Sequence, residues 1–411
     1  MKTKSLIEVF SIVALSLLSM RATAQWSGAK SIRGAKSKYA NQGAFAFTIN
    51  GKGYVGAGII GAGIYDTMLH EYDPISNTWA DKGALPQAMR LSFTVSFVID
   101  DKAYLVGGDS MGDFRQEVFM YEPVTNTWTK KHDFPSGDRD AGFAFSIGGY
   151  GYVGGGTDGI YYLNDIWKYD PAGDSWTKEP NDVPVLALFP SCFVANNKAY
   201  VLMGGAYPSA MDSIVSMWQF DPAGSTWTEK ADFPGSPRED AFAFSNSQYG
   251  YVGGGEQNFT TNYYDMWRYD ANADKWSASD AIPLYGPRGN STFVINNTAY
   301  VGLGVKIFPG RGVNGVDTFY KYTMTAPTSV ASLNKTSIKW MLYPNPATDK
   351  ISIAGKVNDF IISIYDETGH RVKQNHMVNA GQISIEDLTP GVYSIEVNAG
   401  GEISSERFMK K

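Results

Sequence analysis

Four arginines of this 411-residue chain each stand a few residues before an apolar segment. They are Arg90, Arg139, Arg238 and Arg288. Carboxylates follow two of them, Asp140 in one case and Glu239 with Asp240 in the other. Arginine donates paired hydrogen bonds to carboxylates, so four arginines around one cavity would bind an anionic sugar or another carboxylate ligand. Asp140 or Asp240 beside an arginine would suit general acid–base catalysis.

The same arginines also have a structural interpretation. Because they recur with a sequence repeat, each one can span neighbouring repeats, bind loop carbonyls and pair with the next carboxylate. The recurrence favours this structural role, and ligand binding stays the alternative.

Tryptophan marks the repeat itself. The copies end at Trp26, Trp79, Trp128, Trp176, Trp227 and Trp276. These residues lie roughly fifty residues apart, a period typical of propeller arrays. The sixth copy should end near Met324 but has no tryptophan there, whereas Trp26 precedes the first copy. We therefore expect the segment around Trp26 to supply the outermost strand of the sixth unit, beside residues 320–322, and so to close a ring.

Each unit is expected to contain four short strands. In the third copy, larger apolar side chains alternate at Phe143, Phe145 and Ile147, which is the period-two pattern of a strand. Further strands are expected at 150–156, 164–170 and 175–178, and the proline and glycine of residues 170–173 indicate a turn. Four antiparallel strands form one blade, so we predict an all-β, six-bladed propeller over residues 25–325.

Paired glycines, then a tyrosine, then a tryptophan follow in order within the units. The glycine pairs are Gly107-Gly108, Gly155-Gly156, Gly204-Gly205 and Gly254-Gly255. This pattern resembles the kelch repeat, although copies one and six have Ala57-Gly58 and Leu303-Gly304 instead. The resemblance implies a propeller similar to that of galactose oxidase.

The copper site of galactose oxidase needs two histidines, two tyrosines and a cysteine-linked tyrosine. No such motif surrounds Cys192, the one cysteine of the chain. Neither His70 nor His132 has a second histidine at ligand spacing. We therefore predict no metal and no cofactor, and we expect Cys192 and His70 to be packing residues.

The first 24 residues have the features of a secretory signal peptide. Lys2 and Lys4 precede a short apolar run, and Ala22-Thr23-Ala24 offers small residues for cleavage. No later segment has the eighteen consecutive apolar residues of a membrane-spanning helix. Without residues 1–24 the chain has 32 basic and 40 acidic residues, a balance that disfavours nucleic acid as a partner.

A second domain is predicted at the C-terminus. Residues 326–337 are small and polar with one proline, as in a linker, and short alternating strands over 338–411 indicate a small immunoglobulin-like β-sandwich. The stretches 343–349 (YPNPATD) and 388–393 (LTPGVY) and the basic end Lys410-Lys411 resemble the C-terminal sorting domain of type IX secretion substrates.

This resemblance implies a bacterium of the Bacteroidota type and contact with the type IX secretion machinery through residues 338–411. It also implies export across the outer membrane, removal of the domain, and then release or surface attachment.

The function expected from these features is that of a secreted or cell-surface binding protein. A glycan or protein ligand would bind at the mouth of the propeller channel, where the loops 206–213, 256–262 and 305–315 differ most between copies. The alternative is a carbohydrate-active enzyme that resembles the kelch sialate mutarotases, which are also exported and six-bladed. The sequence favours the non-catalytic protein and leaves the ligand and the final location open.

Overall fold

The computed structural model describes residues 26–411, apart from 33–40, 61–63, 187, 203, 206–214, 259, 284–287, 309–311, 316, 326–339, 356–357, 367–370, 380 and 400–401. The predicted signal peptide (1–24) and linker (326–337) lie outside the described residues. The domain boundaries therefore stay predictions.

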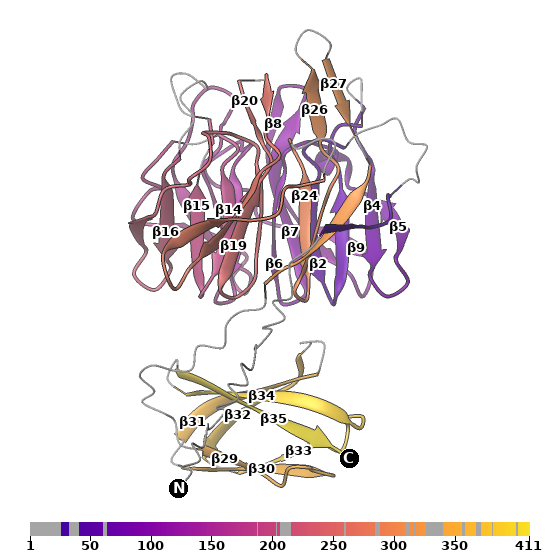
Figure 1. Cartoon of the computed structure of the whole chain (residues 1–411), viewed down its shortest axis with the longest axis vertical. Coiled ribbons are helices and arrows are strands. Elements are labelled where there is room, and N and C mark those ends of the chain that lie inside the picture. Colours follow the sequence, from indigo (N-terminus) through magenta and orange to yellow (C-terminus); the bar gives the residue numbers. More distant parts are fainter. Residues whose placement is uncertain are drawn as a thin grey trace, which may run out of the picture.

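Six four-stranded antiparallel sheets form the blades of a propeller (Figure 1). Blade one has β2 (Phe45–Ile49), β3 (Lys52–Gly56), β4 (Met68–Asp73) and β5 (Thr78–Ala84). Blade two has β6 (Val95–Ile99), β7 (Lys102–Ser110), β8 (Asp113–Glu122) and β9 (Thr127–Lys130). Blade three has β10 (Phe143–Ile147), β11 (Tyr150–Gly154), β12 (Ile166–Asp170) and β13 (Ser175–Lys178).

The other three blades repeat this order. Blade four has β14 (Ser191–Ala195), β15 (Lys198–Leu202), β16 (Met217–Asp221) and β17 (Thr226–Lys230). Blade five has β18 (Phe242–Ser245), β19 (Tyr249–Gly253), β22 (Met266–Asp270) and β23 (Lys275–Ala278). Blade six has β24 (Ser291–Ile295), β25 (Thr298–Gly302), β28 (Phe319–Thr323) and, from the N-terminal end, β1 (Trp26–Gly28). The predicted all-β, six-bladed propeller is confirmed.

Three short elements lie in the connections. The hairpins β20 (Glu256–Gln257) with β21 (Thr261–Asn262) and β26 (Val305–Phe308) with β27 (Gly312–Gly315) extend two loops between second and third strands. The 3-10 turn η1 (Gln87–Met89) lies between blades one and two. No helix among the described residues is long and apolar enough to cross a membrane.

Strand β1 closes the ring as the tryptophan count predicted. Trp26 pairs with Tyr322, and their ring centroids lie 4.9 Å apart. The Trp26 ring also meets Phe242 of blade five edge-on at 6.5 Å. The two ends of the propeller segment therefore share the sheet of blade six, and this pairing closes the ring.

Blades pack on one another through the aromatic side chains of the innermost strands. A Cβ atom on Gly151 of blade three would lie 2.2 Å from the Phe97 ring of blade two. Gly53 and Gly250 are covered in the same way by Phe293 and Phe193. These second-strand glycines are therefore required because a neighbouring ring occupies the space of a side chain.

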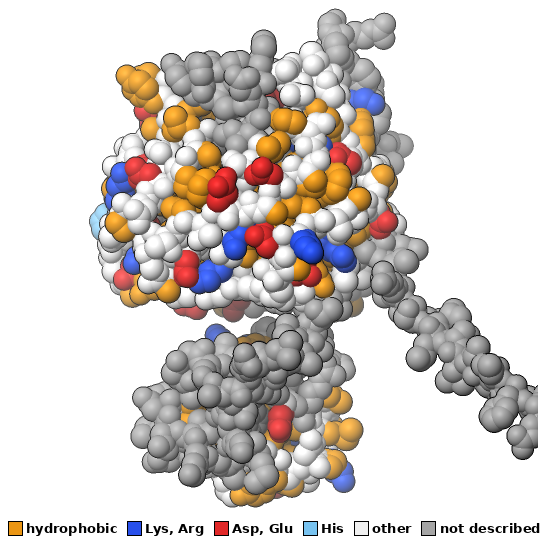
Figure 2. Space-filling model, turned by 60° about the vertical axis from the view of Figure 1, so that its left-hand side comes forward, with side chains coloured by type: hydrophobic (Ala, Val, Ile, Leu, Met, Phe, Trp, Pro, Cys, Tyr) orange, Lys and Arg blue, Asp and Glu red, His pale blue; other side chains and the backbone are white. Residues whose placement is uncertain are grey.

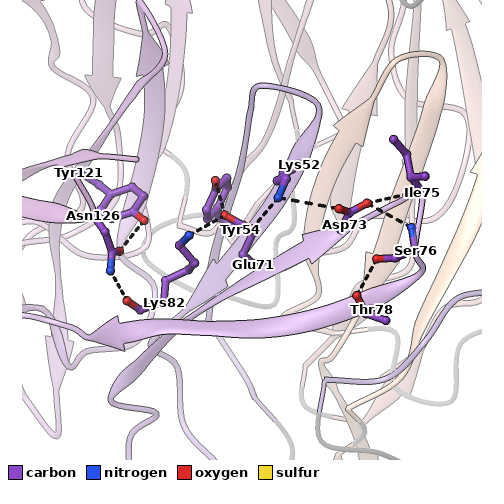
Figure 3. Close-up of polar contacts among 10 residues, drawn as sticks. All are labelled: Lys52, Tyr54, Glu71, Asp73, Ile75, Ser76, Thr78, Lys82, Tyr121 and Asn126. Atoms are coloured by element: carbon purple, nitrogen blue, oxygen red, sulfur yellow. Dashed lines mark hydrogen bonds and ion pairs between the residues drawn. The ribbon is translucent and has the colours of Figure 1, made fainter. Parts of the chain in front are cut away.

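At the end of the propeller where first strands turn into second strands, polar side chains join the blades (Figure 3). Glu71 of blade one accepts hydrogen bonds from Lys52 Nζ (2.9 Å) and Tyr54 Oη (2.7 Å), and Lys82 Nζ lies 3.3 Å away. Tyr121 of blade two donates to Asn126 Oδ1 at 2.8 Å, and Asn126 in turn donates to the Lys82 carbonyl. We call this end of the propeller the turn end.

The C-terminal strands form two further sheets. One has β29 (Trp340–Tyr343), β30 (Lys350–Gly355) and β33 (Gln382–Ser384). The other has β32 (Arg371–Asn379), β31 (Asn358–Tyr365), β34 (Gly391–Ala399) and β35 (Glu402–Lys410). Ile351 and Ile383 from the first sheet share a core with Ile362, Ile395 and Phe408 from the second. This arrangement is a small β-sandwich, and its immunoglobulin-like character stays a prediction.

Candidate functional site at the loop end of the channel

The innermost strands of the six blades line a channel of about 380 Å³. Side chains that alternate with the blade-packing phenylalanines face it, among them Ala46, Ser96 and Cys192. Burial raises the pKa of the Cys192 thiol. A neutral thiol is a weak nucleophile, so Cys192 has the inert role expected for it.

At the end opposite the turn end, which we call the loop end, each blade has a residue in a left-handed backbone conformation two positions before its first strand begins. These residues are Gly43, Phe93, Ala141, Phe189, Asp240 and Gly289. Backbone N–H groups donate from one blade to the preceding one, as from Phe93 to the Gly43 carbonyl (2.8 Å) and from Phe189 to the Ala141 carbonyl (2.9 Å). The same pattern continues from Asp240 to Phe189, from Gly289 to Asp240 and from Gly43 to Gly289.

Two phenylalanines narrow this mouth. The rings of Phe93 and Phe189 meet edge to face with centroids 4.7 Å apart. Phe93 and Phe189 line a cavity of about 150 Å³ together with the other four left-handed residues. A cavity of this size beneath the mouth holds a few waters or a small group of a ligand, so larger ligands would bind on the outer side.

The four predicted arginines do not occupy equivalent positions. Arg288 directly precedes its left-handed residue, Arg139 and Arg238 stand one residue earlier, and Arg90 stands one earlier still. Isolated bridges confirm this register, because Asp140, Glu239 and Arg288 pair with the ends of their second strands in the same way. Among the four arginines, only Arg139 and Arg238 therefore occupy equivalent positions in their repeats.

Arg139 and Arg238 point into their own blades. The Arg139 guanidinium donates to Asp165 at 2.7 Å and to the Gly155 carbonyl at 2.6 Å. Arg238 repeats this with Asp265 at 2.6 Å and the Gly254 carbonyl at 3.1 Å. Both arginines are almost fully buried. The arginines therefore bind a loop carbonyl and a carboxylate, as the structural interpretation expected, but they do so within one blade and do not span neighbouring blades.

The carboxylate partners of these arginines are held ionised. Burial alone would raise the pKa of Asp165, but the hydrogen bond and charge of Arg139 lower it below its usual range. Arg238 and the indole N–H of Trp267 lower the pKa of Asp265 against the same effect of burial. Each pair is therefore an ion pair inside one blade, and the Asp165 side chain is 13% exposed whereas that of Asp265 is 41% exposed.

Asp140 and two carboxylates near Arg288, Glu239 and Asp240, have raised pKa values instead of lowered ones. Burial and then the charge of Asp109 raise the pKa of Asp140 to about 8. The Asp140 Oδ1 atom is buried and accepts no hydrogen bond from the described residues. Asp140 therefore holds its proton more tightly than an ordinary aspartate does.

Arg288 lies beside two carboxylates of blade five, Asp240 and Glu256. Its Nε donates to Asp240 Oδ2 at 2.8 Å and lies 3.6 Å from Glu256 Oε1. Burial raises the pKa of Glu239, and the neighbouring charge of Glu256 raises it further. Burial also raises the pKa of Asp240, against the opposing effect of Arg288. More carboxylates than cations are buried here, which is typical of binding and catalytic sites.

Arg90 lies away from the channel, in a groove of about 710 Å³ between blades one and two. The structure thus brings Asp140, Asp240 and Arg288 to the loop end of the channel and separates Arg90, Arg139 and Arg238 from a common cavity. Their ligand-binding role stays a prediction. Sequence reasoning missed Glu256 and Asp109, although each follows the glycines that end a second strand.

The histidines are placed in polar surroundings. His70 is buried and its two ring nitrogens lie 2.7 Å from Asp81 and 3.1 Å from Asp66, so it bridges carboxylates and is more than the packing residue expected. His132 is exposed and contacts the Asp174 carbonyl of the next blade. Within the described ranges, no three His, Cys, Asp or Glu side chains are grouped to hold a metal ion.

Comparison with known proteins agrees with this architecture. Residues 13–205 match the family model of the KLHDC2/KLHL20/DRC7 Kelch-repeats domain, and residues 341–411 match the secretion system C-terminal sorting domain. The chain therefore carries a kelch-repeat propeller and a type IX sorting domain. A search of curated proteins finds no match.

Among solved structures, the chain is similar to one titled "Structure of YjhT", with a TM-score of 0.57 and 17% identity. The match covers 68% of this chain and 94% of the other. At this identity the likeness concerns the fold alone.

Proposed function

We propose that this protein is an exported kelch-repeat binding protein whose propeller binds a glycan or a protein ligand at the loop end of the channel. The sorting domain implies export by the type IX secretion machinery to the cell surface or beyond. We further propose that residues 1–24 are removed as a signal peptide and that the sorting domain, residues 338–411, is removed on export.

The observation that carries this proposal is the difference between the two ends of the propeller. At the loop end, the connections between second and third strands differ from blade to blade, and β20, β26 and β27 extend from it (Figure 1). Ile160 and Tyr161 of blade three are 79% and 65% exposed there. Variable loops with exposed apolar side chains on a rigid scaffold are the usual basis of recognition.

Figure 2 shows one flank of the propeller, where hydrophobic side chains lie among interspersed acidic and basic side chains. Exposed apolar side chains therefore occur away from the loop end too, and the variation of the loops is what distinguishes that end.

A matched pair of double variants tests the proposal. Ile160→Ser with Tyr161→Ser alters the loop end, and Ile75→Ser with Val124→Ser alters similarly exposed residues of the turn end. We expect the first variant to lose binding on an array of glycans and extracellular proteins and the second to bind like the unaltered protein. Equal binding by both variants, or no binding by the unaltered protein, would contradict the proposal.

A second candidate is a carbohydrate-active enzyme of the sialate mutarotase type. The raised pKa of Asp140 favours it, since a carboxyl group that titrates near neutral pH is suited to proton transfer. Proton NMR of sialic acid anomers measures the equilibration rate directly. A rate above the uncatalysed one that falls in Asp140→Asn would support the enzyme, and an uncatalysed rate would exclude this activity.

A further inference from the structure

A groove between blades one and two combines two arginines with neutral polar side chains. It has a volume of about 710 Å³, which is within the range of small-molecule sites. Arg90 and Arg115 line it together with Tyr65, Thr67, Gln87 and Ser110. No carboxylate contributes to the lining. The charged side chains that line this groove are therefore both arginines, although the chain as a whole is acidic.

Arg90 is held in place without an ion-pair partner. It follows η1, and its backbone N–H donates to the Gln87 carbonyl. Its side chain makes no hydrogen bond or ion pair with any described residue, and its Nε atom is buried. Burying part of a guanidinium without a partner costs free energy, so such a group is suited to bind an anion brought by a ligand.

Arg115 supplies the second positive charge from the opposite wall. Its Nε atom is also buried without a hydrogen bond, and its Nη2 contacts Asp113, whose side chain is 61% exposed. Exposed ion pairs of this kind contribute little, so a ligand anion can replace Asp113 at low cost. Two guanidinium groups facing one groove fit a carboxylate better than a neutral group.

The remaining lining is amphipathic, because Ile64, Ala88 and Leu91 lie beside the polar residues. Tyr65 gives an aromatic surface, and its Oη accepts the backbone N–H of Met111 in blade two at 2.9 Å, which joins the two walls. Thr67, Gln87 and Ser110 offer neutral donors and acceptors of the kind that bind hydroxyl groups. Amphipathic rings flanked by such groups suit a ligand with one apolar face and many hydroxyls.

We propose that this groove binds an acidic oligosaccharide of the uronate type, with a sugar carboxylate held between Arg90 and Arg115. The site is separate from the loop end of the channel. It does not depend on the proposed function, because the groove would bind whether or not the channel mouth does.

Binding of trigalacturonate to the purified full chain, measured by calorimetry, tests the proposal. We expect Arg90→Ala to weaken binding about 10- to 100-fold, the effect of one charge-assisted hydrogen-bonded group. Arg90→Lys should retain part of the affinity. Asp113→Asn should tighten binding about 2- to 3-fold because it frees Arg115, a gain that a merely structural arginine would not produce.

Controls separate the sources of affinity. The methyl ester of trigalacturonate has no charge and should bind at least 10-fold more weakly, and citrate, a carboxylate without a sugar, should not compete. Arg371→Ala removes an exposed arginine of the C-terminal sandwich and should leave binding unchanged. Equal binding of the ester, competition by citrate, or unchanged binding in an Arg90→Ala protein with unaltered thermal stability would overturn the proposal.

Discussion

The turn end and the loop end of the propeller are built from the same repeat but differ in the hydrogen bonds and ion pairs that their polar side chains make. At the turn end, blades one to four and six reverse direction at two-residue turns such as Asn50-Gly51 and Asn196-Asn197, which have positive φ angles. In blades one, two, three and five, the third-strand tyrosine donates to an Asn or Asp five residues later, as Tyr72 and Tyr169 do at 2.7 Å. The turn end therefore repeats one solution in successive blades.

The loop end has no such uniform solution. Its connections range from the long β7–β8 hairpin to the short β20–β21 hairpin. It contains carboxylates whose pKa is lowered and others whose pKa is raised. Asp165 and Asp265 are ionised partners of arginine, whereas Asp140 and Glu239 have raised pKa values. The repeated contacts of the turn end stabilise the fold. The buried carboxylates with raised pKa values at the loop end indicate a functional site.

The largest expected effect comes from breaking a buried ion pair of the loop end. Arg139→Ala leaves Asp165 buried without its main partner and should reduce the free energy of unfolding by about 3–5 kcal/mol in urea denaturation. The turn-end substitution Lys198→Ala removes a half-exposed partner of Asp221 and should cost under about 1 kcal/mol. A double variant with Asp165→Asn should recover part of the loss. Equal effects of Arg139→Ala and Lys198→Ala would contradict the difference between the two ends.

The next effect has the opposite sign. Because the pKa of Asp140 is about 8 in the folded state and ordinary in the unfolded state, the folded protein holds one more proton between about pH 4 and pH 8. Stability therefore falls as pH rises through this window. Asp140→Asn removes the cost of ionisation and should raise the free energy of unfolding by on the order of 1–3 kcal/mol at pH 8, with little change at pH 4. If Asp140→Asn instead lowered the free energy of unfolding at pH 8, the ionised Asp140 carboxylate would not destabilise the folded protein.

The smallest effect tests a carboxylate of the turn end. Burial opposes ionisation of Glu71, but hydrogen bonds from Lys52, Tyr54 and Lys82 lower its pKa overall. Its contribution is therefore present above the unfolded pKa and is lost as pH falls through the lower folded value. Glu71→Gln should cost about 1–2 kcal/mol at pH 7 and little at pH 3, measured by denaturant unfolding. The exposed control Glu229→Gln should change neither value.

Much of the fold follows from repeated residues. The tryptophan spacing gave the number of blades and the closure by β1, and the expected strands of the third copy agree with β10 to β13 within about three residues at each end. In the C-terminal domain, the expected strands are the alternating segments 351–353, 362–364, 383–385 and 392–397. They lie in or overlap β30, β31, β33 and β34, but β32 and β35 were missed. Their sequences, such as Arg371–Asn379, have many polar residues and no clear alternation.

The candidate site was predicted less well. The four arginines looked equivalent because each precedes a strand, but a difference of one residue changes which face of the chain a side chain occupies. Asp140 and Asp240 lie at the loop end, and their role there stays a prediction, whereas the contact between Glu239 and Glu256 was not predicted. It depends on the bridge that joins two strand ends across a tight turn of the backbone.

The sequence by itself determined the propeller, its closure and its route of export, because aromatic packing and sorting motifs are local and repeated. Only the tertiary structure decided which charges are buried with partners and which are not. Arg139 and Arg90 are both arginines before a first strand, yet one is enclosed by its blade and the other lines a groove. The cause is the loops, whose lengths follow no repeat and whose contacts set the local dielectric environment around each charge.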